Sequence, residues 1–305
     1  MKKIGIAIPT YNRVEHLTRL VDSIPQSINL GISDNGAYIK DSLKWDNAKI
    51  VQHIEVIPMF NNWNESISIL EDCDFLAITS DDDFYLENAF DIVSEYINAY
   101  DCDMFIFGCN TIDENDLVTG KYCPEKLELL MPGAGVKYNF YHIPVRMPAI
   151  FFKKTFLEKI GCFDVENFKI TASDSELIQR ALILGKSLYV PIVIANYRMW
   201  GGNATSNTIA TKQWLMEIKN WTGKIKKLAL EVNNDALKLD WSKYEDEVLA
   251  LNILAGLSLL RRKKEYEKLL AHYKMSGIPK KARLVTKLRI IKQVLISKIE
   301  GLRSV

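Results

Sequence analysis

Apolar and polar positions alternate along the first two thirds of the chain with two different periods. Short apolar runs typical of strands lie at residues 4–8, 30–33, 49–57, 75–79, 104–107 and 188–197. Between these runs, apolar residues recur every three or four positions, which predicts helices over residues 14–23, 64–72, 86–100, 156–160 and 175–184. Strands that alternate with helices predict α/β layers around a mainly parallel sheet.

This alternation of predicted strands and helices is interrupted twice along the chain. Residues 110–147 are interrupted by glycines and prolines, which predicts loops or a meander of the kind that often forms lids and binding loops. From residue 211 to the end the pattern is helical, and Pro279 is the only proline. We therefore expect an α/β domain over residues 1–205 and a helical, basic domain over residues 206–305.

The composition is that of an ordinary globular protein. Of the 305 residues, 48% are hydrophobic and 25% are charged. No apolar run reaches the roughly 18 residues that span a bilayer, and the first one ends at Pro9, too early for a secretory signal. Five scattered cysteines without a CxxC pair predict neither a zinc site nor a disulfide framework. A cytoplasmic location is expected.

The charge is distributed unevenly along the chain. Residues 1–200 carry 18 Lys and Arg against 28 Asp and Glu, whereas residues 261–305 carry 14 against 3. Within residues 280–303, apolar side chains recur at near-helical spacing between cations, which is typical of a basic amphipathic helix at an anionic membrane surface. Packing on the helix's own domain and a homo-oligomer contact are the alternative interpretations. No basic–aromatic module for nucleic acid is present.

Three consecutive aspartates, Asp81, Asp82 and Asp83, come after the apolar run at residues 75–79. Parallel strands deliver such residues to the sheet edge where α/β proteins bind ligands. Three adjacent anions repel one another, and a hard divalent cation would compensate them, since Mg²⁺ takes carboxylate and phosphate oxygens. A solvated acidic turn that caps the next helix is the competing interpretation.

Two further motifs come after predicted strands, at residues 9–13 and 34–36. In the first, Thr10, Tyr11 and Arg13 offer a hydroxyl, an aromatic face and a cation, a set that can hold a nucleotide. The alternative is a helix entry capped by Thr10. In the second, Asp34 can accept a hydrogen bond from a base or a ribose, although Asp-Asn-Gly is also a common turn. Three motifs in register at one sheet edge favour a binding site.

Four motifs occur in the order Pro-Thr-Tyr-Asn-Arg (9–13), Ser-Asp-Asn-Gly (33–36), Ser-Asp-Asp-Asp (80–83) and Gly-Cys-Phe-Asp (161–164) with Ser-Asp-Ser-Glu-Leu-Ile-Gln-Arg (173–180). In this order they resemble the family 2 inverting glycosyltransferases, and the resemblance covers residues 3–205. It implies the GT-A fold, a nucleotide-binding α/β domain that uses Mn²⁺ or Mg²⁺.

The resemblance also implies a role for each matching residue. Asp34 would read the base, Asp81 would approach the ribose or the sugar, and Asp83 would bind the metal. Asp82 could serve with either of its neighbours, and Asp174 matches the catalytic base of the family. The nucleotide pocket would be lined by Pro9, Thr10, Tyr11 and Arg13.

Other residues compete for these roles or depart from the pattern. Glu176 lies two positions after Asp174 and would point to a different side of the helix, and Asp164 is expected in a turn or on the acceptor side rather than as the base. Arg180 lies where the family often has an arginine. Many relatives carry a histidine after the last strand, but this chain has Trp200 there, which cannot ligate a metal and would stack on a sugar or close the core.

The expected protein is therefore an inverting, metal-dependent glycosyltransferase of the hexosyltransferase type. The resemblance implies a nucleotide diphosphosugar donor, here expected to be a UDP-sugar, and a lipid-linked saccharide acceptor in bacterial surface polysaccharide synthesis. The peripheral location would be the inner face of the cell membrane. A non-catalytic nucleotide-sugar or membrane-surface binding protein is the alternative. A sugar nucleotidyltransferase is disfavoured because residues 9–13 contain no glycine.

Overall fold

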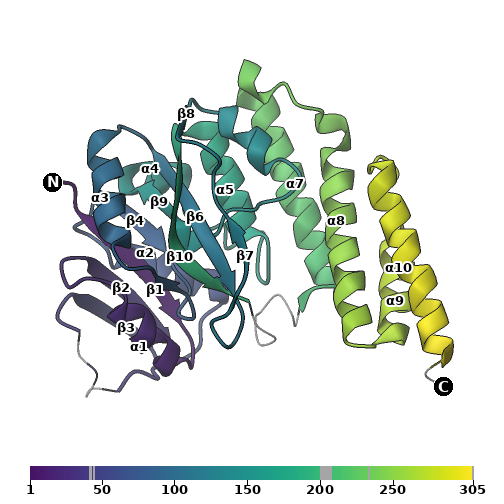
Figure 1. The fold of residues 1–305 in the computed structure, drawn as a ribbon, viewed down its shortest axis with the longest axis horizontal. Helices are drawn as coiled ribbons and strands as arrows, with labels where there is room; N and C mark the ends of the chain where they lie inside the picture. Colours follow the sequence, from purple (N-terminus) through teal and green to yellow (C-terminus); the bar gives the residue numbers. More distant parts are fainter. Residues whose placement is uncertain (41–42, 44, 200–207, 233, 304–305) are drawn as a thin grey trace. The chain divides into compact units, whose positions relative to one another are not determined.

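The computed structural model describes residues 1–40, 43, 45–199, 208–232 and 234–303. Within these residues, ten strands form one sheet in the order β3-β2-β1-β4-β9-β6-β10-β5, with β7 paired to β6 and β8 paired to β10 (Figure 1). The strands are β1 (Ile4–Thr10), β2 (Asn29–Asn35), β3 (Ala48–His53), β4 (Phe75–Ile78), β5 (Phe84–Tyr85), β6 (Met104–Ile112), β7 (Val118–Tyr122), β8 (Glu128–Leu130), β9 (Ile150–Lys153) and β10 (Ser187–Arg198).

The sheet is mainly parallel, as predicted. β1 runs parallel to β2 and β4, β2 to β3, and β6 to β10. β9 lies antiparallel between β4 and β6 and was not predicted. Its apolar residues, Ile150, Phe151 and Phe152, are fully buried, and a run this short has no period from which its partners could be inferred. Two short strands, β7 and β8, lie within the stretch expected to form loops or a meander.

The helices occur in the expected order. They are α1 (Val14–Asp22), α2 (Met59–Ser68), α3 (Ala89–Ala99), α4 (Lys154–Ile160), α5 (Ser173–Leu184), α7 (Lys212–Val232), α8 (Trp241–Arg262), α9 (Tyr266–Ser276) and α10 (Leu284–Arg303), with short 3₁₀ turns at Ala134–Asn139, Met147–Ala149 and Asp235–Leu237. α2 begins five residues before its predicted start, directly after Pro58. Proline lacks an N–H and suits the beginning of a helix, where that donor would have no partner within the helix.

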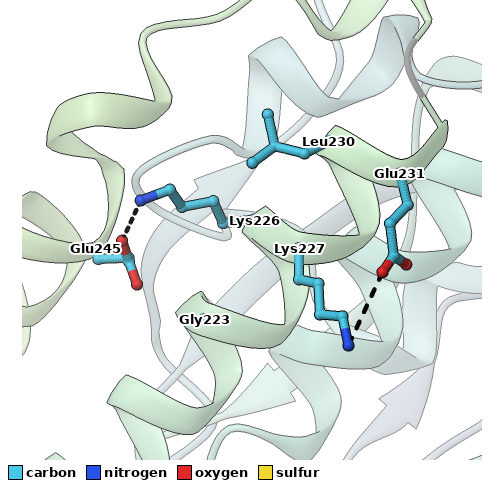
Figure 2. A pocket seen from close by; sticks show the side chains of 6 residues that line it. All are labelled: Gly223, Lys226, Lys227, Leu230, Glu231 and Glu245. Atoms are coloured by element: carbon cyan, nitrogen blue, oxygen red, sulfur yellow. Dashed lines mark hydrogen bonds and ion pairs between the residues drawn. The ribbon is translucent and has the colours of Figure 1, made fainter.

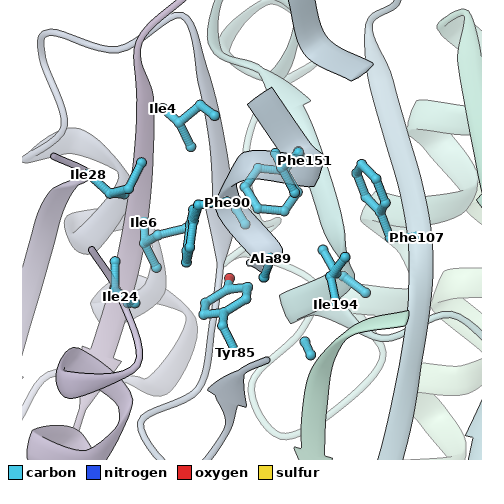
Figure 3. Close-up of a cluster of buried hydrophobic side chains, with 14 of the residues drawn as sticks. Ile4, Ile6, Ile24, Ile28, Tyr85, Ala89, Phe90, Phe107, Phe151 and Ile194 are labelled. Carbon is cyan, nitrogen blue, oxygen red and sulfur yellow. The ribbon is translucent and has the colours of Figure 1, made fainter. Parts of the chain in front are cut away.

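Alternation along β1 divides its side chains between two layers. Ile4, Ile6 and Ile8 point to one face, where they join the core that α1 and α3 cover. Figure 3 shows Ile4 and Ile6 in this core, close to Phe90 of α3. The opposite face carries Gly5 and, on β2, Gly31, against which α2 packs. A β-carbon on Gly31 would lie 2.6 Å from the carbonyl oxygen of Ser66, so the close approach of α2 requires glycine at this position.

The chain forms two compact units, each built from more than one stretch. The first comprises Met1–Val136, Pro144–Lys169 and Arg180–Trp200, and contains the whole sheet. The second comprises Lys137–Ile143, Ile170–Gln179 and Gly201–Val305. The boundary expected near residue 205 lies outside the described residues.

The second unit is organised around a buried amide. The side chain of Gln179 donates to the carbonyl oxygens of Asn139 and Phe140, at 2.5 and 3.1 Å. Its own oxygen accepts from the indole of Trp221 at 2.9 Å and from the hydroxyl of Tyr244 at 2.5 Å. These four bonds tie α5 to the backbone at residues 139–140, to α7 and to α8. In the described part of the chain, no helix has the length and apolar character needed to cross a membrane.

Candidate functional site

The sheet register brings three predicted motifs to one edge. Thr10 at the end of β1 lies opposite Asp34 at the end of β2. β4 runs parallel to β1 on its other side, so the three aspartates after β4 emerge at the same edge. Pro9 is buried beside them in β1 and pairs with Ser33.

Asp81 makes several contacts within this cluster. It accepts hydrogen bonds from the Thr10 hydroxyl at 2.7 Å, from the Tyr11 backbone N–H at 3.3 Å and from Arg13 Nη1 at 3.1 Å. The same Arg13 nitrogen lies 3.1 Å from Asp82 Oδ2. One guanidinium group therefore bridges two buried carboxylates, so Arg13 supplies part of the positive charge that the sequence analysis assigned to a divalent cation.

Asp83 has one satisfied and one unsatisfied oxygen. Oδ1 accepts the backbone N–H of Arg198 at 2.9 Å. Oδ2 is buried and has no hydrogen-bond partner among the described residues. Burial, together with the neighbouring charge of Asp82, raises the pKa of Asp83 well above its usual range.

This unsatisfied oxygen fits a divalent cation. A buried carboxylate without a partner is unfavourable, and a hard cation takes such an oxygen. In the described parts of the chain, no group of three His, Cys, Asp or Glu side chains is arranged as a metal site.

Burial also raises the pKa of Asp81, from its ordinary value of 3.8 to about 6, against the opposing effect of Arg13. A carboxyl group with a raised pKa in the folded state stabilises the fold while it is protonated, and that stabilisation is lost as the pH rises through the folded-state pKa. We expect the free energy of unfolding of the metal-free protein, minus that of Asp81→Asn, to fall by about 2 kcal/mol between about pH 4 and about pH 6. Urea unfolding of both proteins across this range measures the difference, and a constant difference would contradict the raised pKa.

Asp34 also has one oxygen to spare. Oδ2 accepts the backbone N–H of Ile39 at 2.8 Å and the side-chain amide of Gln52 at 2.9 Å. Oδ1 is buried and lacks a partner in the described structure. Two donors thus fix the orientation of the carboxylate and leave one oxygen to accept a further hydrogen bond.

Two tyrosines provide aromatic surface in the same region. The rings of Tyr11 and Tyr38 meet edge to face, with centroids 5.6 Å apart, and both remain partly exposed. Tyr38 was not among the predicted site residues. It comes shortly after Gly36, whose φ of +108° turns the chain directly after β2. An exposed aromatic edge beside Asp34 is suited to contact a planar base.

Arg198 is a residue of the site that the sequence analysis did not single out. Its side chain is buried and donates to the carbonyl oxygens of Asp82 and Asp113, at 3.0 and 2.9 Å, and to Asp116 Oδ1 at 2.5 Å. Together with its backbone bond to Asp83, it holds the turn that carries the aspartates. Its position at the end of the last strand, next to Tyr197, was the available signal.

A comparison of two arginines tests this holding role. We expect Arg198→Met to lower the free energy of unfolding by about 3 kcal/mol, because buried carbonyl oxygens and Asp116 lose their partner. Arg19 pairs with the same Asp116 at 2.6 Å, but its side chain is 49% exposed, so Arg19→Met is expected to cost less than about 1 kcal/mol. Urea unfolding of both variants provides the measurement. Equal losses would show that Arg198 contributes only a surface ion pair.

Asp174 belongs to the second unit, in the first turn of α5. It is exposed, and its Oδ1 accepts the backbone N–H of Ser175 at 2.6 Å. The competing Glu176 is fully buried and pairs with Lys224 at 3.0 Å. The backbone just before α5 is held by Glu217, which accepts the N–H groups of Ile170 and Thr171, at 3.1 and 2.9 Å. Of the two acids, Asp174 presents its carboxylate to solvent.

Three other residues that the resemblance singled out remain. Two of them make hydrogen bonds that stabilise the local backbone, and one lies outside the described residues. Arg180 is buried and donates to the carbonyl oxygens at the end of α4, those of residues 160–162. Asp164 accepts the backbone N–H groups of Glu166 and Asn167, both at 3.0 Å, as expected in a turn. Trp200 lies outside the described residues.

A groove on α7 in the second unit is a competing candidate for a binding site. It is lined by Gly223, Lys226, Lys227, Leu230, Glu231 and Glu245 (Figure 2). Lys226 pairs with Glu245 at 2.5 Å, and Lys227 lies 3.8 Å from Glu231. Both cations are already neutralised by acids of the same groove, so the sheet edge remains the stronger candidate.

Comparisons with known proteins agree on the fold. No protein-family profile matches the chain, and no curated protein matches it. Crystal structures of Staphylococcus aureus TarS residues 1–349, determined alone, with UDP-GlcNAc and with UDP, match 99% of this chain and 91–92% of their own, with a TM-score of 0.56 and 12–15% identity. The predicted fold class, an α/β domain with a mainly parallel sheet followed by C-terminal helices, is confirmed.

Proposed function

We propose that this protein is a glycosyltransferase that takes a sugar from a nucleotide diphosphosugar, a UDP-sugar, and transfers it to a saccharide hydroxyl. The observation that carries the proposal is the buried cluster at the sheet edge, where Asp34 and Asp83 each have one oxygen without a partner among the residues that the structure describes. The fold is shared with S. aureus TarS, which has been crystallised with UDP-GlcNAc and with UDP. That likeness supports a UDP-sugar as the donor.

The nucleoside would lie over the ends of β1 and β2. Asp34 Oδ1 would accept a hydrogen bond from the base, and the Tyr11 ring would provide an aromatic contact. Arg13 already bridges Asp81 and Asp82 and would hold both carboxylates in place beside the donor. Asp81 would accept from the ribose or the sugar through an oxygen already aligned by Thr10.

Asp83 would hold Mg²⁺ or Mn²⁺ through its unsatisfied Oδ2, together with oxygens of the donor's diphosphate. Such an ion, when bound, supplies Lewis-acid stabilisation of the negative charge on the departing diphosphate. Arg198 keeps the other oxygen of Asp83 engaged and so fixes the direction in which Oδ2 points.

Asp174 would act as the general base. An acceptor hydroxyl loses its proton as it attacks the anomeric carbon, and a carboxylate at solvent can take that proton. Ser175 orients the Asp174 side chain through Oδ1 and leaves Oδ2 available. Direct displacement inverts the anomeric configuration, which makes the proposed reaction an inverting hexosyl transfer. A lipid-linked saccharide of a bacterial surface polysaccharide is the proposed acceptor class.

The test is nucleotide release from a panel of UDP-, GDP- and dTDP-sugars with Mn²⁺, with Mg²⁺ and with EDTA. Slow hydrolysis of one donor that stops with EDTA is expected and would identify the donor. Binding of a nucleotide sugar without any turnover would favour the alternative of a non-catalytic binding protein. If no nucleotide bound or shifted the melting temperature, the assignment of the sheet edge would be wrong.

A further inference from the structure

The last helix, α10, has a well-packed inner face. Thr286, Ile290, Val294 and Ser297 are buried, and the helix contacts α8 and α9. The buried acid Glu247 of α8 accepts from the Thr286 hydroxyl at 2.7 Å. α10 is therefore packed against its own unit through this inner face.

The outer face of α10 carries an exposed apolar stripe. Its members lie four, three, four, four and three residues apart, which places them along one side of the helix. They are Leu284, Leu288, Ile291, Leu295, Ile299 and Leu302, with exposed fractions of 71%, 54%, 39%, 55%, 53% and 81%. A contiguous apolar surface of this kind on a globular protein marks a docking site.

Cations flank the stripe on both sides. At 100° per residue, Lys298 lies along one edge, and Lys292 and Arg289 lie along the other. Within the described residues, none of the three forms an ion pair. Glu300 is the only acid in the α10 sequence, and it pairs with Arg261 at 2.6 Å. The exposed face of α10 is thus apolar along its middle and positive at its edges.

We propose that this outer face docks on an anionic phospholipid bilayer, with α10 lying in the plane of the interface. Leu and Ile side chains would enter the headgroup–acyl boundary, while Lys and Arg would reach the lipid phosphates. A second copy of the chain fits less well, because two such faces would bring cations against cations. The inference goes beyond the proposed function and does not depend on it.

Flotation of the full-length protein with lipid vesicles tests the proposal. The probes are vesicles of equal parts phosphatidylglycerol and phosphatidylcholine, and vesicles of phosphatidylcholine alone. Binding to the first kind, weakened by salt and absent from the second, is expected. Equal binding to both, or binding to neither, would overturn the proposal.

An apolar variant and a matched control locate the contact. We expect Leu288→Ser with Leu295→Ser to weaken binding at least about tenfold, because two exposed leucines no longer enter the lipid. Leu230→Ser changes an equally exposed leucine on α7, at 61% exposure, and should leave binding unchanged. Equal losses in both variants would place the contact elsewhere.

A charge variant distinguishes an effect of the net charge of the protein from an effect of the cations beside the stripe. Replacing Arg289, Lys292 and Lys298 by glutamine should weaken binding roughly a hundredfold. The control replaces three exposed lysines outside α10, namely Lys219, Lys227 and Lys238, and changes the net charge equally. If the control lost as much affinity, net charge alone would account for binding. A dimer in solution that the leucine variant abolishes would assign the face to a second copy instead.

Discussion

Asp83→Asn is expected to slow metal-dependent turnover severely while leaving the metal-free protein at least as stable as the wild type. Asp83 is 2% exposed, and its Oδ2 has no partner in the described structure. In the metal-free protein the ionised carboxylate therefore lowers the free energy of unfolding, and a neutral amide of the same shape lowers it less. The asparagine oxygen can still accept the N–H of Arg198.

The loss of turnover should be large. A divalent ion contributes several kcal/mol of transition-state stabilisation, so removing its protein ligand should slow nucleotide-sugar hydrolysis roughly a thousandfold. Turnover and Mn²⁺-induced thermal shift would be measured on the same preparations. The shift should also disappear in the variant.

The pH dependence adds a second readout for Asp83. Its pKa is raised in the folded state, so its ionisation destabilises the metal-free wild type as the pH rises, and the variant should gain relative stability. Asp101→Asn is the control, because that side chain is 88% exposed. Unchanged turnover in Asp83→Asn would show that another group holds the metal or that no metal is needed.

Asp174→Asn is expected to lower transfer roughly 10²–10⁴-fold, the range that general-base assistance supplies. Donor affinity and melting temperature should change little, because the side chain is exposed and makes only local bonds to Ser175. Steady-state transfer and nucleotide binding by calorimetry measure the two properties separately.

Glu176→Gln provides the matched control for Asp174, two positions further along α5. Its carboxylate is buried and paired with Lys224, so this variant should lose stability and retain most of its turnover. The two acids would then show opposite patterns, one catalytic and one structural. The reverse pattern, with turnover lost in Glu176→Gln and kept in Asp174→Asn, would move the base to Glu176.

The parts of the site that could be predicted are formed by residues that are consecutive in the sequence. The apolar run predicts a buried strand, and the three aspartates after it must then lie at the sheet edge where that strand ends. The pairing of Thr10 with Asp34 also results from two adjacent parallel strands. Helices such as α1 and α10 could also be predicted, because their apolar periodicity is a property of neighbouring residues in the sequence.

Contacts between distant residues could not be read in this way. Arg198 meets Asp82 and Asp116 across more than eighty residues of chain, and nothing local to Arg198 encodes those partners. The insertion of β9 between β4 and β6 likewise depends on how far-apart strands pair. The buried amide of Gln179 occupies an ordinary helical position in the sequence, and its four partners come from three other segments of the chain.

The glycine on β2 has a consequence for how this site can change. α2 carries Asn62, which is buried and accepts from the Ser33 hydroxyl at 2.7 Å, directly beside Asp34. Any larger residue at Gly31 would push α2, and with it Asn62, away from the strand that presents Asp34. Laboratory evolution of this protein toward new donors would therefore be constrained at a position that has no functional group at all.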